Sequence, residues 1–170
     1  MKGKRGLEFL ASLHPKTVHY PIALLSIYPV LILIYNFYRN ELLAKGALLM
    51  LAGGVAGVFL ALLTGNSAFQ SFVEANARHP QINMITELIE VHEDFATGMV
   101  VVFGVIFILH FSYFVRNYIK KDTPTKFFAN LPRVLLALSA LGLFFLYKTG
   151  EIGGKLVFEY GVGTRNFQVH

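Results

Sequence analysis

Long runs without a charged residue constrain the fold of this chain more than any other feature of its sequence. Three such runs cover residues 17–38, 46–73 and 95–115. A helix of about 20 apolar residues crosses a bilayer core that is roughly 30 Å thick. Each run reaches that length, so the sequence predicts three membrane-spanning helices.

A fourth run, at residues 134–147, is too short to cross a bilayer by itself. It becomes long enough if residues 127–131 join it and the Arg133 side chain extends to the lipid headgroups. We therefore predict an all-α integral membrane protein, a single four-transmembrane-helix bundle over residues 1–170. The predicted spans are residues 18–38, 46–70, 95–117 and 129–148.

The number and placement of the charged residues are typical of a membrane protein. Only 15% of the residues are charged, against about 25% in a soluble domain. The net charge of +5 comes from short basic segments between apolar runs, which favours a lipid bilayer and not nucleic acid as the partner. The absence of cysteine excludes disulfides, thiolate nucleophiles and covalent attachment of a c-type haem.

The connecting segments predict how the bundle is oriented. The first and third loops carry seven basic residues: Arg39, Lys45, Arg116, Lys120, Lys121, Lys126 and Arg133. The positive-inside rule places these loops in the cytoplasm and both termini outside. The segment at about 74–94 is polar with a helix-compatible pattern, so we expect the long third helix to extend out of the membrane.

Histidines at the outer end of the bundle are the candidate functional residues. His14 and His19 lie at the outer entrance to the first span, and His92 lies at the outer entrance to the third. If these parallel helices are neighbours, His19 and His92 can bind one metal, the iron of haem b, with His14 as the alternative ligand from the first helix. Lys16 and Tyr20 lie close enough in sequence to contact the haem propionates.

His110 lies within the third span, 18 residues after His92, and faces the same side of the helix. Two histidines placed in this way occur in di-haem b-type cytochromes. No second histidine is available at the depth of His110, so the sequence supports one haem, and His110 is expected to form an interhelical hydrogen bond. Two alternatives remain open: a non-haem metal site that includes His14, His19, His92 and Glu93, and a cofactor-free membrane anchor or assembly subunit.

Three segments resemble motifs of one bacterial membrane-protein family, the domain of unknown function 2231. They read HPKTVHYPIALL at residues 14–25, VHEDFAT at 91–97 and GGKLVFEYGVG at 153–163. The resemblance implies four helices, with His14, His19 and His92 as the motif histidines. Tyr160 stands where the family pattern often has histidine. Some relatives are fused to Rieske-type or cytochrome c-type modules, which implies electron transfer at the outer face.

Together these observations predict a b-type cytochrome-like subunit that transfers electrons, and not a stand-alone enzyme. The expected electron donor is a quinol in the membrane, and the expected acceptor is a periplasmic Rieske-type or cytochrome c-type protein. A second copy of the chain is a further candidate partner.

Overall fold

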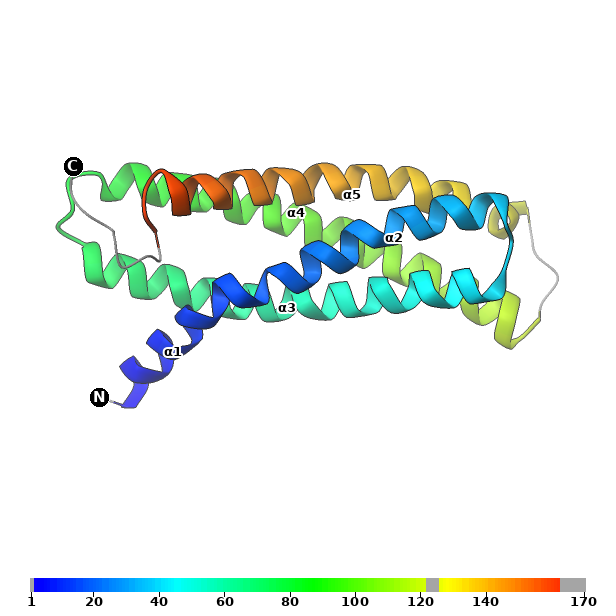
Figure 1. Cartoon of the computed structure of the whole chain (residues 1–170), viewed down its shortest axis with the longest axis horizontal. Helices are drawn as coiled ribbons and strands as arrows, with labels where there is room; N and C mark the ends of the chain where they lie inside the picture. Colours follow the sequence, from blue (N-terminus) through cyan, green and yellow to red (C-terminus); the bar gives the residue numbers. More distant parts are fainter. Residues whose placement is uncertain (1, 122–125, 163–170) are drawn as a thin grey trace.

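The computed structural model describes residues 2–121 and 126–162, which form long helices joined by short turns (Figure 1). The helices are α1 (Lys2–Thr17), α2 (His19–Phe37), α3 (Glu41–Asn76), α4 (Ile82–Phe114) and α5 (Lys126–Phe158). A π-helical turn, η1 (Val115–Ile119), continues α4. No β-strand occurs among the described residues, so the predicted all-α fold is confirmed.

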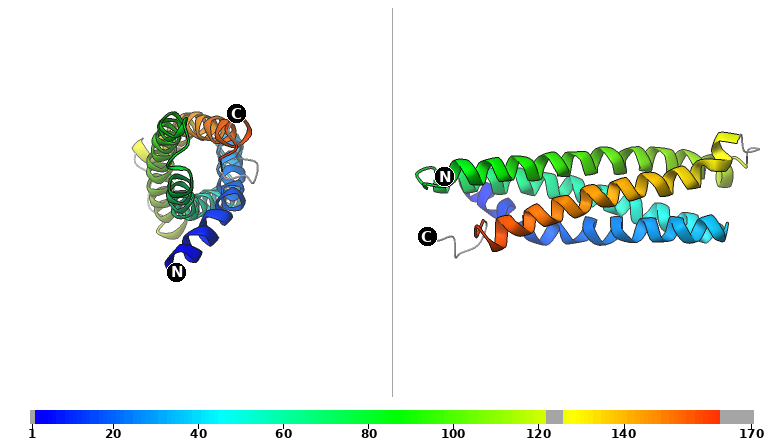
Figure 2. Two further views of the ribbon diagram at one scale, coloured as in Figure 1. Left: turned by 90° about the vertical axis from the view of Figure 1, so that its left-hand side faces the viewer. Right: turned by 90° about the horizontal axis from the view of Figure 1, so that it is seen from above.

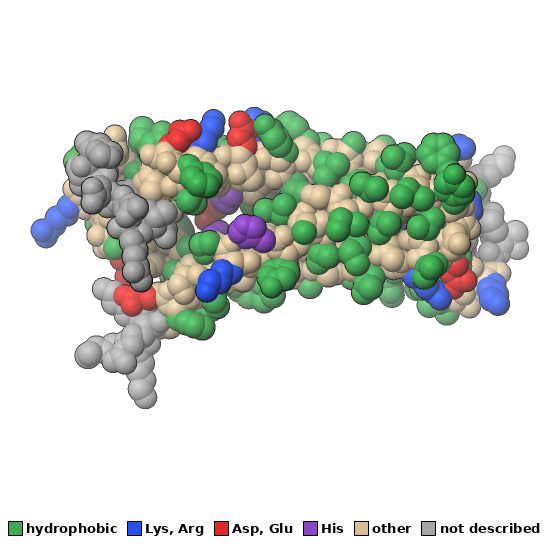
Figure 3. Space-filling model, in the orientation of Figure 1, with side chains coloured by type: hydrophobic (Ala, Val, Ile, Leu, Met, Phe, Trp, Pro, Cys, Tyr) green, Lys and Arg blue, Asp and Glu red, His purple; other side chains and the backbone are tan. Residues whose placement is uncertain are grey.

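Four stretches of helix are long and apolar enough to cross a membrane, as predicted. They cover Gly6–Phe37, Glu41–Asn76, Ile82–Ile119 and Phe128–Phe158. The helices surround a common axis (Figure 2), and apolar side chains cover much of the outer surface (Figure 3). Such a surface suits a lipid solvent, in which every backbone polar group must be satisfied within the helices. The two ends of the described chain lie at the same end of the bundle (Figure 1).

The first span consists of two helices, α1 and α2, and Pro21 explains the break between them. Proline lacks an N–H group, and its ring clashes with the carbonyl group four residues earlier, which is that of Thr17. The neighbouring backbone hydrogen bonds are retained: Val18 N donates to His14 O at 3.2 Å, and Ile22 N donates to Val18 O at 3.3 Å. α1 ends at Thr17. Its N-terminal end projects away from the bundle (Figures 1 and 2), whereas His14 and Thr17 in its last turn contact α3.

Three helices continue beyond the predicted spans at the end of the bundle where the termini lie. α4 begins at Ile82, which confirms the predicted extension of the third helix. α3 continues to Asn76 and α5 to Phe158, whereas the predicted spans stop at residues 70 and 148. Apolar residues at helical spacing within these polar segments explain the difference, because they form a second core. Its buried members are Phe72, Ile85, Ile89, Ile152 and Leu156.

Glycines determine how closely the helices approach one another in the main core. A Cβ atom added at Gly54 of α3 would lie 2.5 Å from Leu25 Cδ2 of α2. At Gly98 of α4, it would lie 2.5 Å from Phe145 Cε1 of α5. Small residues permit such close contacts in membranes, where helix association depends on packing and not on the hydrophobic effect.

Tyrosines join the helices at the opposite end of the bundle. The Tyr35 hydroxyl lies 2.7 Å from that of Tyr113 and 2.8 Å from that of Tyr118. The Arg39 guanidinium lies 5.3 Å from the centre of the Tyr35 ring. These contacts connect α2 to α4 and η1. The tyrosine hydroxyl groups hydrogen-bond to one another at this end of the bundle.

We expect Gly54→Ala to destabilise the protein and Gly46→Ala, in the same helix, to stabilise it. Alanine is preferred to glycine in a helix by roughly 1 kcal/mol, and a Cβ at Gly46 meets no atom within 4 Å. A Cβ at Gly54 overlaps Leu25, which is fully buried, and overpacking costs about 1–3 kcal/mol. Unfolding of the detergent-solubilised protein in SDS, followed by circular dichroism, measures the difference. Equal stability of the two variants would contradict the close α2–α3 contact.

Candidate functional site

His14 and His92 are the two histidines that the structure brings together. His14 lies in the last turn of α1 and His92 lies near the start of α4. Both are partly buried, and charges on the two imidazoles would interact with each other. Figure 3 shows histidine side chains beside an opening in the surface between α2 and α5.

The imidazole of His14 is held by α3. Its Nδ1 lies 3.2 Å from Thr64 Oγ1, and the ring packs on Gly65, where an added Cβ would lie 3.0 Å from Cε1 and 3.4 Å from Nδ1. The backbone carbonyl of Ala61, four residues before Gly65, also interacts with the ring. A larger residue at position 65 would displace the imidazole from its present position.

The imidazole of His92 has nearly the same relation to α5. An added Cβ at Gly153 would lie 3.0 Å from Cε1 and 3.4 Å from Nδ1 of His92. The carbonyl of Thr149, four residues before Gly153, interacts with this ring. Unlike its counterpart in His14, Nδ1 of His92 is buried without a hydrogen-bond partner.

Each imidazole therefore faces a helix with its Cε1 edge, and Nδ1 is slightly nearer than Nε2, which would lie 3.6 Å from the added Cβ in His14 and 4.0 Å in His92. In histidines that bind metals, the nitrogen that does not bind the metal normally donates to a carbonyl, a carboxylate or water, and this bond orients the ring. The Thr64 hydroxyl can serve this purpose for His14, whereas Nδ1 of His92 has no such partner. The arrangement is suited to two nitrogen ligands, one from each half of the chain. No group of three or more His, Asp or Glu residues able to hold a metal occurs in residues 2–121 and 126–162.

The other site residues predicted from the sequence lie further out. His19 is the first residue of α2 and its side chain is exposed. Lys16 is exposed as well, and Tyr20 retains 70% of its accessible surface. Position around the helix explains the difference, because five residues at about 100° each turn the His19 side chain about 140° away from that of His14. Gly65, Gly153 and Thr64 were not predicted, although a glycine inside a helix indicates a close contact.

His110 lies in the main core and not at this site. It is fully buried in α4, and its Nδ1 lies 3.3 Å from the Tyr28 hydroxyl of α2. This contact is the interhelical hydrogen bond that the sequence predicted. Its Nε2 is buried without a partner.

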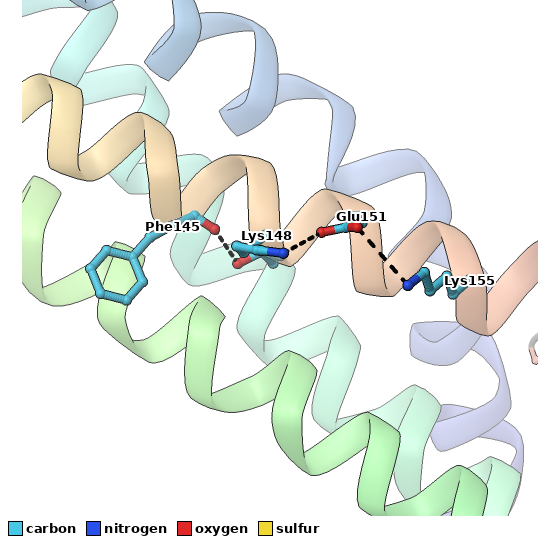
Figure 4. Close-up of polar contacts among 5 residues, drawn as sticks. Phe145, Lys148, Glu151 and Lys155 are labelled. Carbon is cyan, nitrogen blue, oxygen red and sulfur yellow. Dashed lines mark hydrogen bonds and ion pairs between the residues drawn. The ribbon is translucent and has the colours of Figure 1, made fainter.

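A row of charged residues follows the outward surface of α5 near the site (Figure 4). Lys148 Nζ lies 2.8 Å from Glu151 Oε2, and Lys155 Nζ lies 3.9 Å from Glu151 Oε1. The Thr149 hydroxyl donates to the Phe145 carbonyl at 2.8 Å (Figure 4). One carboxylate thus faces two ammonium groups, and α5 keeps an excess positive charge beside the site.

The comparisons with known proteins agree with this structure. The model of a family described as "Predicted membrane protein (DUF2231)" matches residues 11–166, which include His14, His19, His92 and both glycines. No curated protein and no solved structure matches the chain. Because the match covers most of its length, the chain belongs to the DUF2231 family of predicted membrane proteins.

Proposed function

We propose that this protein is a b-type cytochrome-like membrane subunit in which His14 and His92 are the two axial ligands of one haem b. The observation that carries the proposal is the pair of partly buried imidazoles, contributed by α1 and α4, each of which packs against a glycine of a neighbouring helix. The opening beside the histidines (Figure 3) supports access to the site from the membrane or its surface.

The donor set fits a haem better than a zinc or copper ion bound by the protein alone. A porphyrin occupies four positions around the iron, so the protein supplies only two axial ligands. Structural zinc sites need four protein ligands and catalytic sites need three. Thr64 occupies Nδ1 of His14 and Nδ1 of His92 is buried, so Nε2 of each ring is the nitrogen that would bind the iron.

A bound haem would supply one-electron transfer, because two histidine ligands leave no open position on the iron for oxygen chemistry. Gly65 and Gly153 would let the two rings pack closely against α3 and α5 and so orient them. The excess positive charge of Lys148 and Lys155 over Glu151 favours the anionic propionates. Lys16 and Tyr20, exposed at the same end, are further candidates for these contacts.

The proposed partners follow from this position. A quinol in the bilayer is the proposed electron donor, and a periplasmic Rieske-type or cytochrome c-type protein is the proposed acceptor. The family resemblance supports the second partner, since some relatives are fused to such modules. The geometry favours His14 over His19 as the first ligand, because the His19 side chain is exposed.

We expect His14→Ala and His92→Ala each to abolish the low-spin haem spectrum, because each removes one of two axial ligands. His19→Ala and His79→Ala are the controls and should retain it. Reduced-minus-oxidised absorption spectra of protein purified from a haem-replete host measure this, and wild-type protein should not bind carbon monoxide readily. Colourless wild-type protein would refute the haem proposal, and loss of haem in His19→Ala alone would replace His14 by His19 as the ligand.

Gly153→Ala should lower haem occupancy or change its spectrum, whereas Gly154→Ala should not. The added methyl group at position 153 would lie 3.0 Å from His92 Cε1, and at position 154 it meets no atom within 4 Å. The two variants change neighbouring residues of one helix by the same group. The ratio of haem absorbance to protein in parallel preparations compares them, and identical ratios would contradict the role of Gly153 in placing the ring.

We also propose that both termini lie outside the bacterial inner membrane, because basic residues concentrate in the first and third loops. The exposed residues Lys121 and Glu159 lie in segments at opposite ends of the bundle and allow a test. With each replaced in turn by cysteine, a membrane-impermeant thiol reagent should label position 159 and not position 121 in intact cells. Labelling at position 121 alone would reverse the orientation.

A further inference from the structure

We propose that Thr64 is a positioning residue that fixes the proton of His14 on Nδ1 and so leaves the lone pair on Nε2. Its effect on the properties of a bound haem rests on the function proposed above, whereas its effect on the histidine tautomer does not. Thr64 is 5% exposed, so its hydroxyl group must be satisfied within the protein.

The hydrogen-bond partners of Thr64 determine the direction of its contact with His14. Its Oγ1 lies 2.9 Å from the Leu60 carbonyl, 3.1 Å from the Ala61 carbonyl and 3.0 Å from Thr17 Oγ1, which itself donates to the His14 carbonyl. A carbonyl can only accept, and a hydroxyl has one proton to donate. The Thr64 proton is therefore directed to one of these oxygens, and a carbonyl of the preceding turn is the common acceptor for threonine inside helices. Toward His14, at 3.2 Å, Oγ1 can then only accept.

The acceptor role of Thr64 Oγ1 determines the tautomer of His14. Because Oγ1 only accepts on this side, Nδ1 of His14 must carry a proton. A neutral imidazole has one N–H group, so Nε2 of His14 is unprotonated and is a Lewis base before any ligand binds.

His92 provides a natural comparison because it packs on α5 in almost the same way. The residue before Gly153 is Ile152, where the residue before Gly65 is Thr64. Ile152 cannot accept a hydrogen bond, and Nδ1 of His92 is buried without a partner. The two imidazoles thus differ in one group, the hydroxyl of Thr64.

This difference has a chemical consequence for the two rings as metal ligands. A hydrogen bond from Nδ1–H makes an imidazole more basic at Nε2 and fixes the plane of the ring. His14 is consequently the stronger and better-oriented ligand of the pair. Loss of such an outer contact typically weakens metal binding about 10–100-fold.

The experiment compares Thr64→Val, which has nearly the same shape without the hydroxyl, with Thr64→Ser, which keeps it. Ile152→Thr tests the reverse change at His92. Solid-state NMR of protein labelled with ¹³C,¹⁵N-histidine and prepared without haem distinguishes the Nδ1–H and Nε2–H tautomers. His14→Gln identifies the His14 signals, and circular dichroism confirms that each variant is folded. Haem titration and potentiometry are then carried out on the same variants.

We expect only the Nδ1–H tautomer at His14 in the wild type and in Thr64→Ser, and a mixture of tautomers in Thr64→Val. Haem should bind about tenfold more weakly to Thr64→Val, with a higher midpoint potential, because a less basic ligand stabilises ferric iron less. Ile152→Thr should lower the potential. A tautomer ratio that is the same in Thr64→Val and the wild type would overturn the proposal, as would Nε2–H in the wild type. Wild-type protein that takes up no haem but shows the expected tautomers would refute the proposed function and retain the role of Thr64.

Discussion

Close approach of helices at glycine is the constraint on which the rest of this structure depends. Within a bilayer, apolar side chains gain little by leaving lipid, so helices associate where their surfaces fit. Gly54 and Gly98 bring α3 and α4 into contact with bulky residues of α2 and α5. The same device recurs at Gly65 and Gly153, but there the neighbouring group is an imidazole. Close approach at a glycine therefore shapes both the packing of the helices and the candidate site.

The fold could be predicted from the sequence because charge-free runs report directly on membrane spans. The extensions of α3 and α5 were not included in the predicted spans, because their polar residues hide a stripe of apolar residues such as Phe72 and Leu156. Only the acidic segment before the third span was predicted to be helical, and α4 confirms it. Hydropathy identifies helix that faces lipid, and it does not detect helix that buries an apolar face against other helices.

The site was only partly predictable, because it depends on distant residues and on one local bend. The sequence identified the three outer histidines, and it favoured His19 because His19 is nearest to the start of an apolar run. Pro21 interrupts the helix and leaves His14 on a separate segment that contacts α3. Thr64 and the two glycines, which contact the imidazole rings, lie on other helices. They are so far from His14 and His92 in sequence that no short motif contains both.

The division of the site between two halves of the chain determines the order in which it can form. Protein synthesis proceeds from the N-terminus, and segments made first fold first. α1, α2 and α3 contain His14, Thr64 and Gly65, so one imidazole can reach its final position while the second half is still being made. His92 becomes fixed only when Gly153, near the end of α5, has been made and packs against it. A ligand that needs both imidazoles is thus bound last, by a chain that has already completed its insertion.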